Sequence, residues 1–178
     1  MTPTALPRQE KVWDIVVRLF HWSLVACVLA NLLLLEEGDP PHRWAGYIAL
    51  GLIALRLVWG FVGSRHARFA SFFPTPSRLA AHLAALKSGR HQPSVGHNPA
   101  GALMMLALMA LVIGLGVSGY LMGTDQFWGE EWLEEVHEAL ATLLQVAVLL
   151  HVAAALLMSR IERVNLLRAM ITGIKTWR

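Results

Sequence analysis

The chain has 178 residues, of which 56% are hydrophobic and only 15% are charged. Soluble domains usually carry about 25% charged residues, so this composition, with a mean hydropathy of +0.51, excludes an ordinary soluble globule. The single cysteine, Cys27, excludes an intrachain disulfide, a four-cysteine iron–sulfur site and the two-cysteine attachment of c-type haem. The formal net charge is +3. We therefore expect an all-α integral membrane protein with one membrane domain over residues 1–178.

Four apolar stretches are long enough to cross about 30 Å of hydrocarbon at about 1.5 Å per residue. We expect these spans at about residues 12–35, 43–62, 100–122 and 136–158. The first is expected to be an uncleaved helix rather than a signal peptide, because it contains Arg18 and His21 and ends in Glu36-Glu37 instead of small residues. The expected architecture is a four-helix bundle in the membrane core.

Charges outside the spans are segregated by loop. Lysine and arginine gather before the first span, in the loop 63–99 and in the tail 159–178, whereas the two other loops are acidic and have only Arg43 to oppose them. The acidic residues are Glu36, Glu37, Asp39, Asp125, Glu130, Glu131, Glu134 and Glu135. Because basic loops stay on the cytoplasmic side, we expect a multi-pass membrane protein with both termini, the long loop and the tail in the cytoplasm.

Two of the cytoplasmic segments have the spacing of helices that lie on an anionic membrane surface. Residues 77–87 place three leucines on one helical face, with Ser77 as the expected N-cap, and apolar residues recur every three or four positions from Ile161 to Ile174. The alternative for each is a solvated loop or tail.

Four histidines lie in or at the ends of the spans: His21, His42, His137 and His151. His137 and His151 are 14 residues apart (151 − 137 = 14), which corresponds to about 40° short of four turns and about 21 Å of helix rise. They share a face of the fourth span but cannot hold one metal ion. Combined with the expected topology, the positions form an inner pair, His21 with His151, and an outer pair, His42 with His137.

Paired imidazoles from different helices can occupy both axial positions of a b-type haem, which needs no covalent attachment. Arg18, Arg43 and Arg56 are candidate partners for haem propionates, because a guanidinium binds a carboxylate bidentately. Glycines of the second and third spans are expected to leave room for a flat porphyrin. The alternatives are histidines that only hydrogen-bond across helices, or zinc, whose tetrahedral shell two histidines leave incomplete.

The remaining histidines fall in the cytoplasmic loop: His66, His82, His91 and His97. We expect their side chains to be solvated or in contact with lipid headgroups. His97, in the sequence Gly96-His97-Asn98-Pro99 before the third span, is also a candidate for the border of a quinone pocket.

Several motifs resemble those of the bacterial cytochrome b561 family and, more broadly, of the b-type cytochrome subunits of nickel–iron hydrogenases. They are Arg18-x-x-His21-Trp22, His42-x3-Gly46 followed by Arg56, His137-Glu138-x-Leu140-Ala141, Leu150-His151-x-Ala153-Ala154-Ala155, and Asn165-Leu166-Leu167-Arg168. The resemblance runs from about Val12 to Arg168. It implies a four-helix bundle in the bacterial inner membrane that holds two haem b groups, with His21, His42, His137 and His151 as the axial ligands. It also implies that electrons pass between a quinone pool and a partner.

We expect one-electron transfer between quinone and a periplasmic partner, in contact with membrane lipid and without nucleic acid or a separate set of catalytic residues. The acidic outer loops would attract a basic protein, such as a periplasmic cytochrome c or redox enzyme, and would repel superoxide. The alternatives are a haem-bearing anchor subunit of a hydrogenase or other dehydrogenase, a superoxide-oxidising quinone reductase, and a haem-free membrane scaffold or transporter.

Overall fold

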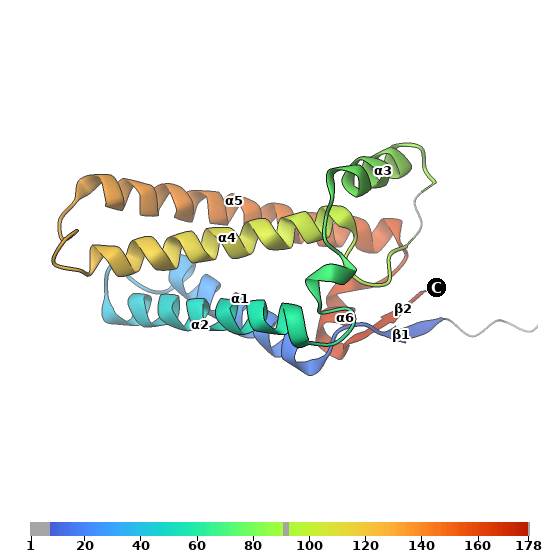
Figure 1. Cartoon of the computed structure of the whole chain (residues 1–178), viewed down its shortest axis with the longest axis horizontal. Coiled ribbons are helices and arrows are strands. Elements are labelled where there is room, and N and C mark those ends of the chain that lie inside the picture. Colours follow the sequence, from blue (N-terminus) through green and yellow to red (C-terminus); the bar gives the residue numbers. More distant parts are fainter. Residues whose placement is uncertain (1–7, 91–92, 178) are drawn as a thin grey trace, which may run out of the picture.

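The computed structural model describes residues 8–90 and 93–177. The described chain forms a bundle of helices with a two-stranded sheet at one end (Figure 1). The helices are α1 (Ile15–Leu33), α2 (Pro40–Val62), α3 (Pro76–Lys87), α4 (Pro99–Met122), α5 (Glu131–Ile161) and α6 (Leu166–Thr172), with a short 3₁₀ turn at Phe69–Ser71. The strands are β1 (Gln9–Lys11) and β2 (Ile174–Thr176).

Four helices, α1, α2, α4 and α5, are long and apolar enough to cross a membrane. They expose large apolar side chains over most of their length, for example Leu33 at 72% and Leu149 at 71%. In a helix every backbone hydrogen bond is satisfied internally, so such surfaces suit lipid and not water. The chain is therefore a multi-pass membrane protein, as the composition predicts.

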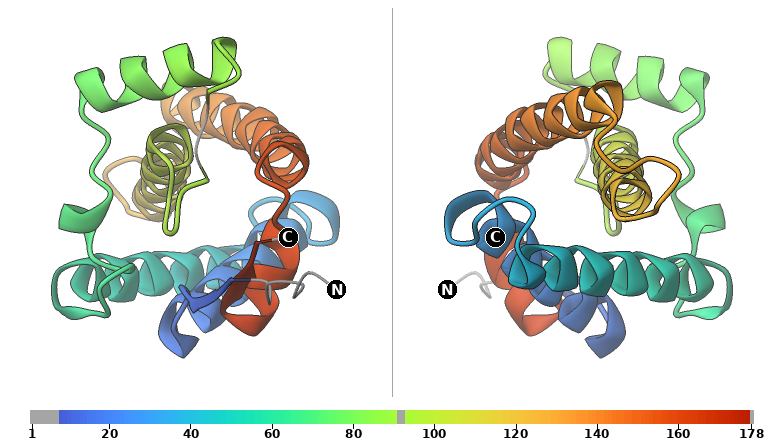
Figure 2. Two further views of the ribbon diagram at one scale, coloured as in Figure 1. Left: turned by 90° about the vertical axis from the view of Figure 1, so that its right-hand side faces the viewer. Right: turned by 90° about the vertical axis from the view of Figure 1, so that its left-hand side faces the viewer.

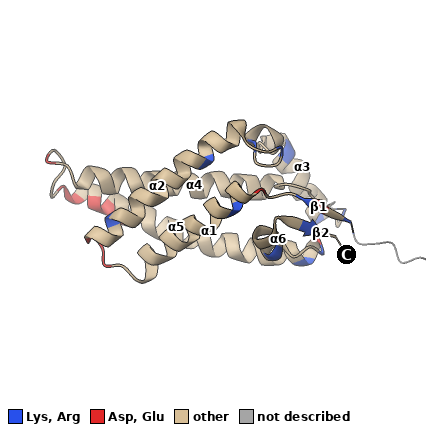
Figure 3. Cartoon of the chain, turned by 90° about the horizontal axis from the view of Figure 1, so that it is seen from below, with Lys and Arg blue, Asp and Glu red and all other residues tan. Residues whose placement is uncertain are grey.

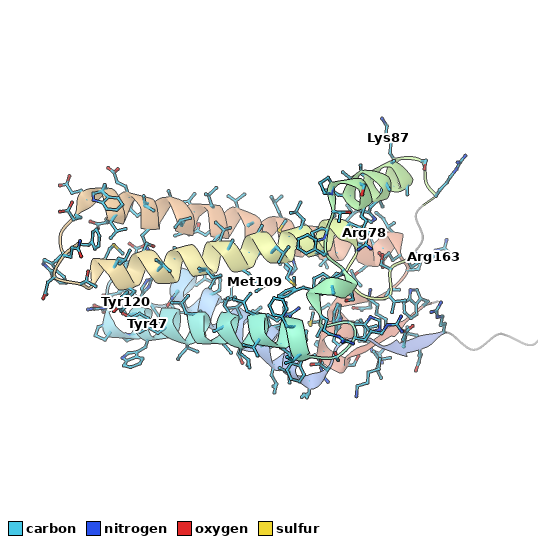
Figure 4. The ribbon with its side chains drawn as sticks, viewed as in Figure 1. Tyr47, Arg78, Lys87, Met109, Tyr120 and Arg163 are labelled. Atoms are coloured by element: carbon cyan, nitrogen blue, oxygen red, sulfur yellow. The ribbon has the colours of Figure 1, made fainter. Side chains whose placement is uncertain are left out.

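The long helices pack in two layers, α1 with α2 and α4 with α5, and α2 and α4 join the layers (Figure 2). An apolar cluster between the layers draws on all four helices, including Phe20 of α1, Ile53 of α2, Met109 of α4 and Leu144 of α5. Figure 4 shows Met109 between α4 and α2. Leu144 is seven residues from both His137 and His151 on α5 (144 − 137 = 151 − 144 = 7), so this cluster lies at the depth midway between the two.

The positions of capping residues determine where the helices begin, and these positions differ from the ends expected from hydropathy. The Asp14 carboxylate accepts a hydrogen bond from the Val17 backbone N–H (2.9 Å) and starts α1 at residue 15, not 12. Asn98 caps α4 in the same way, through the Gly101 N–H (2.7 Å). The fourth span is longer than the expected 136–158, because α5 already begins at Glu131, where acidic residues favour a helix N-terminus.

The two ends of the described chain pair with each other. β1 and β2 are antiparallel, with Gln9 opposite Thr176 and Lys11 opposite Ile174, and the N–H groups of Val12 and Trp13 both donate to the Gly173 carbonyl (2.8 and 3.1 Å). The spacing of apolar residues predicts one interfacial helix in the tail, and this prediction is wrong. Arg163, at φ 52°, and Gly173, at φ 84°, turn the chain at either end of α6, and a seven-residue helix and a strand replace the single helix.

The long cytoplasmic loop also differs in detail from expectation. α3 begins at Pro76 and its cap is Thr75, whose hydroxyl accepts from the Arg78 N–H (3.3 Å), not Ser77. Proline favours the first helical position, which moves the cap one residue back from it. His82 of this helix is buried, at 8% exposure, rather than solvated.

Acidic and basic residues gather at opposite ends of the bundle. Figure 3 shows most Asp and Glu at the end that carries the α1–α2 and α4–α5 loops, and most Lys and Arg at the end that carries α3, α6 and the sheet. The acidic end is called the outer end below and the basic end the inner end.

Candidate functional site

The structure brings His21 of α1 and His151 of α5 together near the inner end. Their ring centroids are 6.5 Å apart and their planes are inclined by 50°. The His21 Nδ1 is shielded from solvent and has no hydrogen-bond partner among the described residues. Trp22, whose indole meets the His21 ring edge-on at 5.1 Å, donates from Nε1 to the Met170 carbonyl (3.4 Å) and links α1 to α6.

His42 of α2 and His137 of α5 form a second pair, near the outer end. Their ring centroids are 6.3 Å apart with an inclination of 59°. The Nδ1 of His42 is likewise buried without a partner among residues 8–90 and 93–177, whereas the Nδ1 of His137 lies 2.8 Å from the Ser118 Oγ. Because α5 supplies one member of each pair, the two pairs are held apart by a single helix.

The separation within each pair fits a metal ion between two imidazoles. A coordinating ring nitrogen lies about 2 Å from a metal ion and about 1.1 Å from its own ring centroid, so two axial imidazoles place their centroids about 6.2 Å apart. The observed distances are 6.3 and 6.5 Å. In the part of the chain that the structure describes, no three His, Cys, Asp or Glu side chains gather at one point, so the pairs suit a cofactor that supplies the other ligands, as a porphyrin does.

Glycines differ in the space beside them. A Cβ added at Gly46 or Gly51 of α2 would meet no atom within 4 Å, so these positions leave the room expected for a flat group. The glycines of the third span do not. A Cβ at Gly116 would lie 2.3 Å from the Leu50 Cγ, because α4 packs against α2 there. The expectation of porphyrin space is therefore wrong for Gly116, which serves helix packing.

The three candidate propionate partners have different surroundings. Arg56 is buried, at 2% exposure; its Nη2 donates to the Ala67 carbonyl (2.9 Å) and its guanidinium lies over the Phe69 ring (4.9 Å). Arg43 donates from Nε to the Gly38 carbonyl (3.0 Å) at the outer end. The Nη1 of Arg56 and the Nε of Arg18 are buried without a partner among the described residues. These two arginines therefore keep a donor for an anionic group.

His97 is half-buried between aromatic rings, not solvated as its loop position suggests. Its ring lies between Trp13 and Phe72, each at a centroid distance of 4.7 Å. Burial, and then the positive charges of Arg56 and Lys175, lower the pKa of His97 to about 3. Its Nδ1 has no hydrogen-bond partner in the described chain. His97 is thus a neutral, aromatic-flanked imidazole with a free ring nitrogen.

Two charged residues that the sequence analysis did not single out hold this region in place. Lys175 of β2 is 3% exposed, and its Nζ donates to the carbonyls of Ser94 (2.8 Å) and Gly96 (3.2 Å), which directly precede His97. Burial lowers the pKa of Lys175, against the opposing effect of nearby carboxylates. No local signal marks such a lysine, because its partners lie about 80 residues away in the sequence.

Asp14 forms the second anchor. Besides capping α1, its carboxylate accepts hydrogen bonds from the Trp59 Nε1 (3.0 Å) and the Ser64 hydroxyl at the end of α2. Burial alone would raise the pKa of Asp14, but these hydrogen bonds and that of Val17 together lower it. Of the other loop histidines, His66 lies 3.5 Å from the Glu10 carboxylate, and His91 lies outside the described residues.

Comparison with known proteins supplies a family. A family model described as prokaryotic cytochrome b561 matches residues 12–173, which include both histidine pairs, Asp14 and His97 but not β1 or β2. No curated protein matches the chain.

Proposed function

Because the chain belongs to the prokaryotic cytochrome b561 family and is a b-type membrane cytochrome of electron transfer, we propose that it holds two b haems. One is bound by His21 and His151 and the other by His42 and His137, as the motifs of the sequence imply. The observation that carries this proposal is the separation of 6.3–6.5 Å between ring centroids within each pair, close to the spacing expected for two imidazoles that share one iron.

The chain's own contribution is to hold and insulate the two sites. Bound haem would supply reversible one-electron chemistry. The rigid α5 fixes the spacing of the pairs, about 21 Å of helix rise for 14 residues, and the apolar cluster around Leu144 and Met109 keeps water from the space between them. Arg18 and Arg56, with their buried free donors, are the proposed partners of the inner propionates, and Arg43 is the proposed partner at the outer end.

We propose that quinone exchanges electrons near the inner pair. His97 supports this: Trp13 and Phe72 hold its neutral imidazole in place, and its Nδ1, without a partner among the described residues, is the proposed polar contact to quinone. With basic loops kept inside, residues 63–99 and 159–178 and both termini would lie in the cytoplasm, and residues 1–178 would form one membrane domain.

At the outer end we propose a basic periplasmic protein as the partner, such as a cytochrome c or another redox enzyme. The acidic side chains that gather there (Figure 3) would steer a positive protein and repel superoxide. Electron exchange should then slow as ionic strength rises. Stable co-purification with a dehydrogenase would instead favour the function of a haem-bearing anchor subunit.

The test is haem stoichiometry in detergent-purified protein, measured by pyridine haemochrome with a dithionite-reduced spectrum. We expect two b haems per chain in the wild type and one in each double variant, His21→Ala/His151→Ala and His42→Ala/His137→Ala. His66→Ala, which removes a histidine outside both pairs, is the matched control and should keep two. Colourless wild-type protein from haem-rich cells would refute the proposal and favour a haem-free scaffold.

A further inference from the structure

Ser118 and Gly119 of α4 lie against the ring of His137. Ser118 is 4% exposed, and its Oγ lies 2.8 Å from the His137 Nδ1. A Cβ added at Gly119 would lie 3.3 Å from the His137 Cε1 and 3.8 Å from its Nδ1. The Nδ1–Cε1 edge of the ring therefore rests on two neighbouring small residues of the adjacent helix.

The hydrogen bonds around Ser118 assign the donor. Its Oγ lies 2.9 Å from the Gly114 carbonyl and 3.2 Å from the Leu115 carbonyl, and these oxygens can only accept. A helical serine commonly gives its single hydroxyl proton to such a carbonyl, and in that arrangement Oγ has only a lone pair to offer His137. The Nδ1 of His137 must then carry the proton and donate it to Ser118, which leaves the Nε2 lone pair free to bind a metal ion.

The other pair members with a buried Nδ1 have no such support. The Nδ1 atoms of His21 and His42 find no hydrogen-bond partner among the described residues. Of these three ligand candidates, only His137 has its tautomer fixed by a neighbouring side chain, so the two sites differ in a way that the ring distances, 6.5 and 6.3 Å, do not reveal.

We infer that Ser118 is a positioning residue for the outer site: it fixes the orientation and tautomer of His137 and makes the outer iron harder to reduce than it would otherwise be. The inference rests on the proposed function. An Nδ1–H that donates a hydrogen bond makes the imidazole a stronger donor at its other nitrogen, and a stronger donor favours ferric over ferrous iron. Such outer partners change metal affinity by about tenfold or more.

The test is a redox titration of the purified holoprotein followed by its haem absorbance. The inner couple is identified first, as the one that remains in the His42→Ala/His137→Ala variant. Ser118→Ala should raise the outer potential by up to about 59 mV, the equivalent of a tenfold change for one electron, and leave the inner potential unchanged; selective loss of the outer haem would also support the inference. Ser118→Thr, which keeps a hydroxyl, should return the outer potential toward the wild-type value.

Two further variants separate this role from general destabilisation. Ser159→Ala is the matched control, because the Ser159 hydroxyl also donates to the carbonyl four residues earlier (2.7 Å) and accepts from the Leu166 N–H (3.1 Å), with no histidine as a hydrogen-bond partner among the described residues. This variant should change neither potential. Gly119→Ala should alter only the outer haem's spectrum or retention, since the ring must move by a few tenths of an ångström.

The inference is overturned if the wild type shows two couples and Ser118→Ala shifts neither, or if Ser118→Thr shifts the outer couple as far as Ser118→Ala does. A wild type without an outer couple refutes the proposed function itself, and with it this inference. The haem count of the wild type therefore distinguishes the two failures.

Discussion

Replacing His97 by phenylalanine should remove a pH dependence of the protein's stability. Burial and the charges of Arg56 and Lys175 lower the pKa of His97 from 6.5 to about 3. Between these values the unfolded chain binds a proton that the folded chain does not. Stability contributed by the neutral imidazole is therefore complete above pH 6.5 and is lost progressively as the pH falls from 6.5 toward 3.

The magnitude follows from the difference in pKa. Each pH unit below the pKa of the unfolded state, 6.5, lowers the free energy of unfolding by about 1.4 kcal/mol. Lowering the pH from 7.5 to 5 should therefore reduce the free energy of unfolding of the wild type by about 2 kcal/mol through His97 alone. His97→Phe keeps an aromatic ring between Trp13 and Phe72 and has nothing to titrate, so this part of the loss should disappear.

The assay is unfolding by sodium dodecyl sulfate in mixed micelles, followed by circular dichroism at pH 7.5, 6 and 5. Comparison of the two proteins cancels the titration of all other groups. The control is His66→Phe, which removes a half-buried histidine near Glu10. Parallel pH profiles for wild type and His97→Phe would refute the reasoning and show that His97 is accessible to protons in the folded state.

Three further predictions concern the supporting contacts. Asp14→Ala should lower the free energy of unfolding by about 3 kcal/mol, because a helix cap and two hydrogen bonds to a carboxylate are lost. The same micelle titration measures this loss. An equal loss of unfolding free energy in Asp14→Asn would contradict the prediction. In haem-free protein, Gly116→Ala should lower the free energy of unfolding by about 1–3 kcal/mol, since the new methyl overlaps Leu50. Gly51→Ala should leave the stability of the haem-free protein unchanged, because the space beside Gly51 is open. Lys175→Met should speed amide hydrogen exchange in residues 94–98, because the Lys175 Nζ holds the carbonyls of Ser94 and Gly96. Unchanged exchange there would show that the loop holds its shape without the lysine.

Sequence alone predicted the membrane part of the fold well, because hydropathy and helix rise determine where a chain can cross a bilayer. Four long apolar helices lie where the spans are expected, and their ends shift where caps such as Asp14, or the acidic start of α5, decide the helix length. The family resemblance is confirmed as well. The pairing of histidines by depth rests on the same arithmetic, and the structure places the members of each pair close together; their role as ligands remains a prediction.

The inner end of the bundle was not predictable from local patterns. The positions of His97 and Lys175 depend on contacts between the tail, the N-terminal segment and the long loop, which are far apart in the sequence. Strands of three residues carry almost no periodic signal, and so β1 and β2 were missed. Ser118 resembles any other small residue in an apolar span until its distance to His137 is known.

The pairing of β1 with β2 also orders the assembly of the protein. A chain emerging from the ribosome completes the outer pair with His137, then the inner pair with His151, and can close the sheet only after residues 174–176 have appeared. This closure joins segments more than 160 residues apart (174 − 11 = 163), which makes it a late event in the folding of the chain. Until then the inner end lacks the strand whose Lys175 holds the loop before His97. A prosthetic group that binds during biosynthesis would therefore meet a bundle whose inner end is still open, and one that binds later would meet a bundle closed by the sheet.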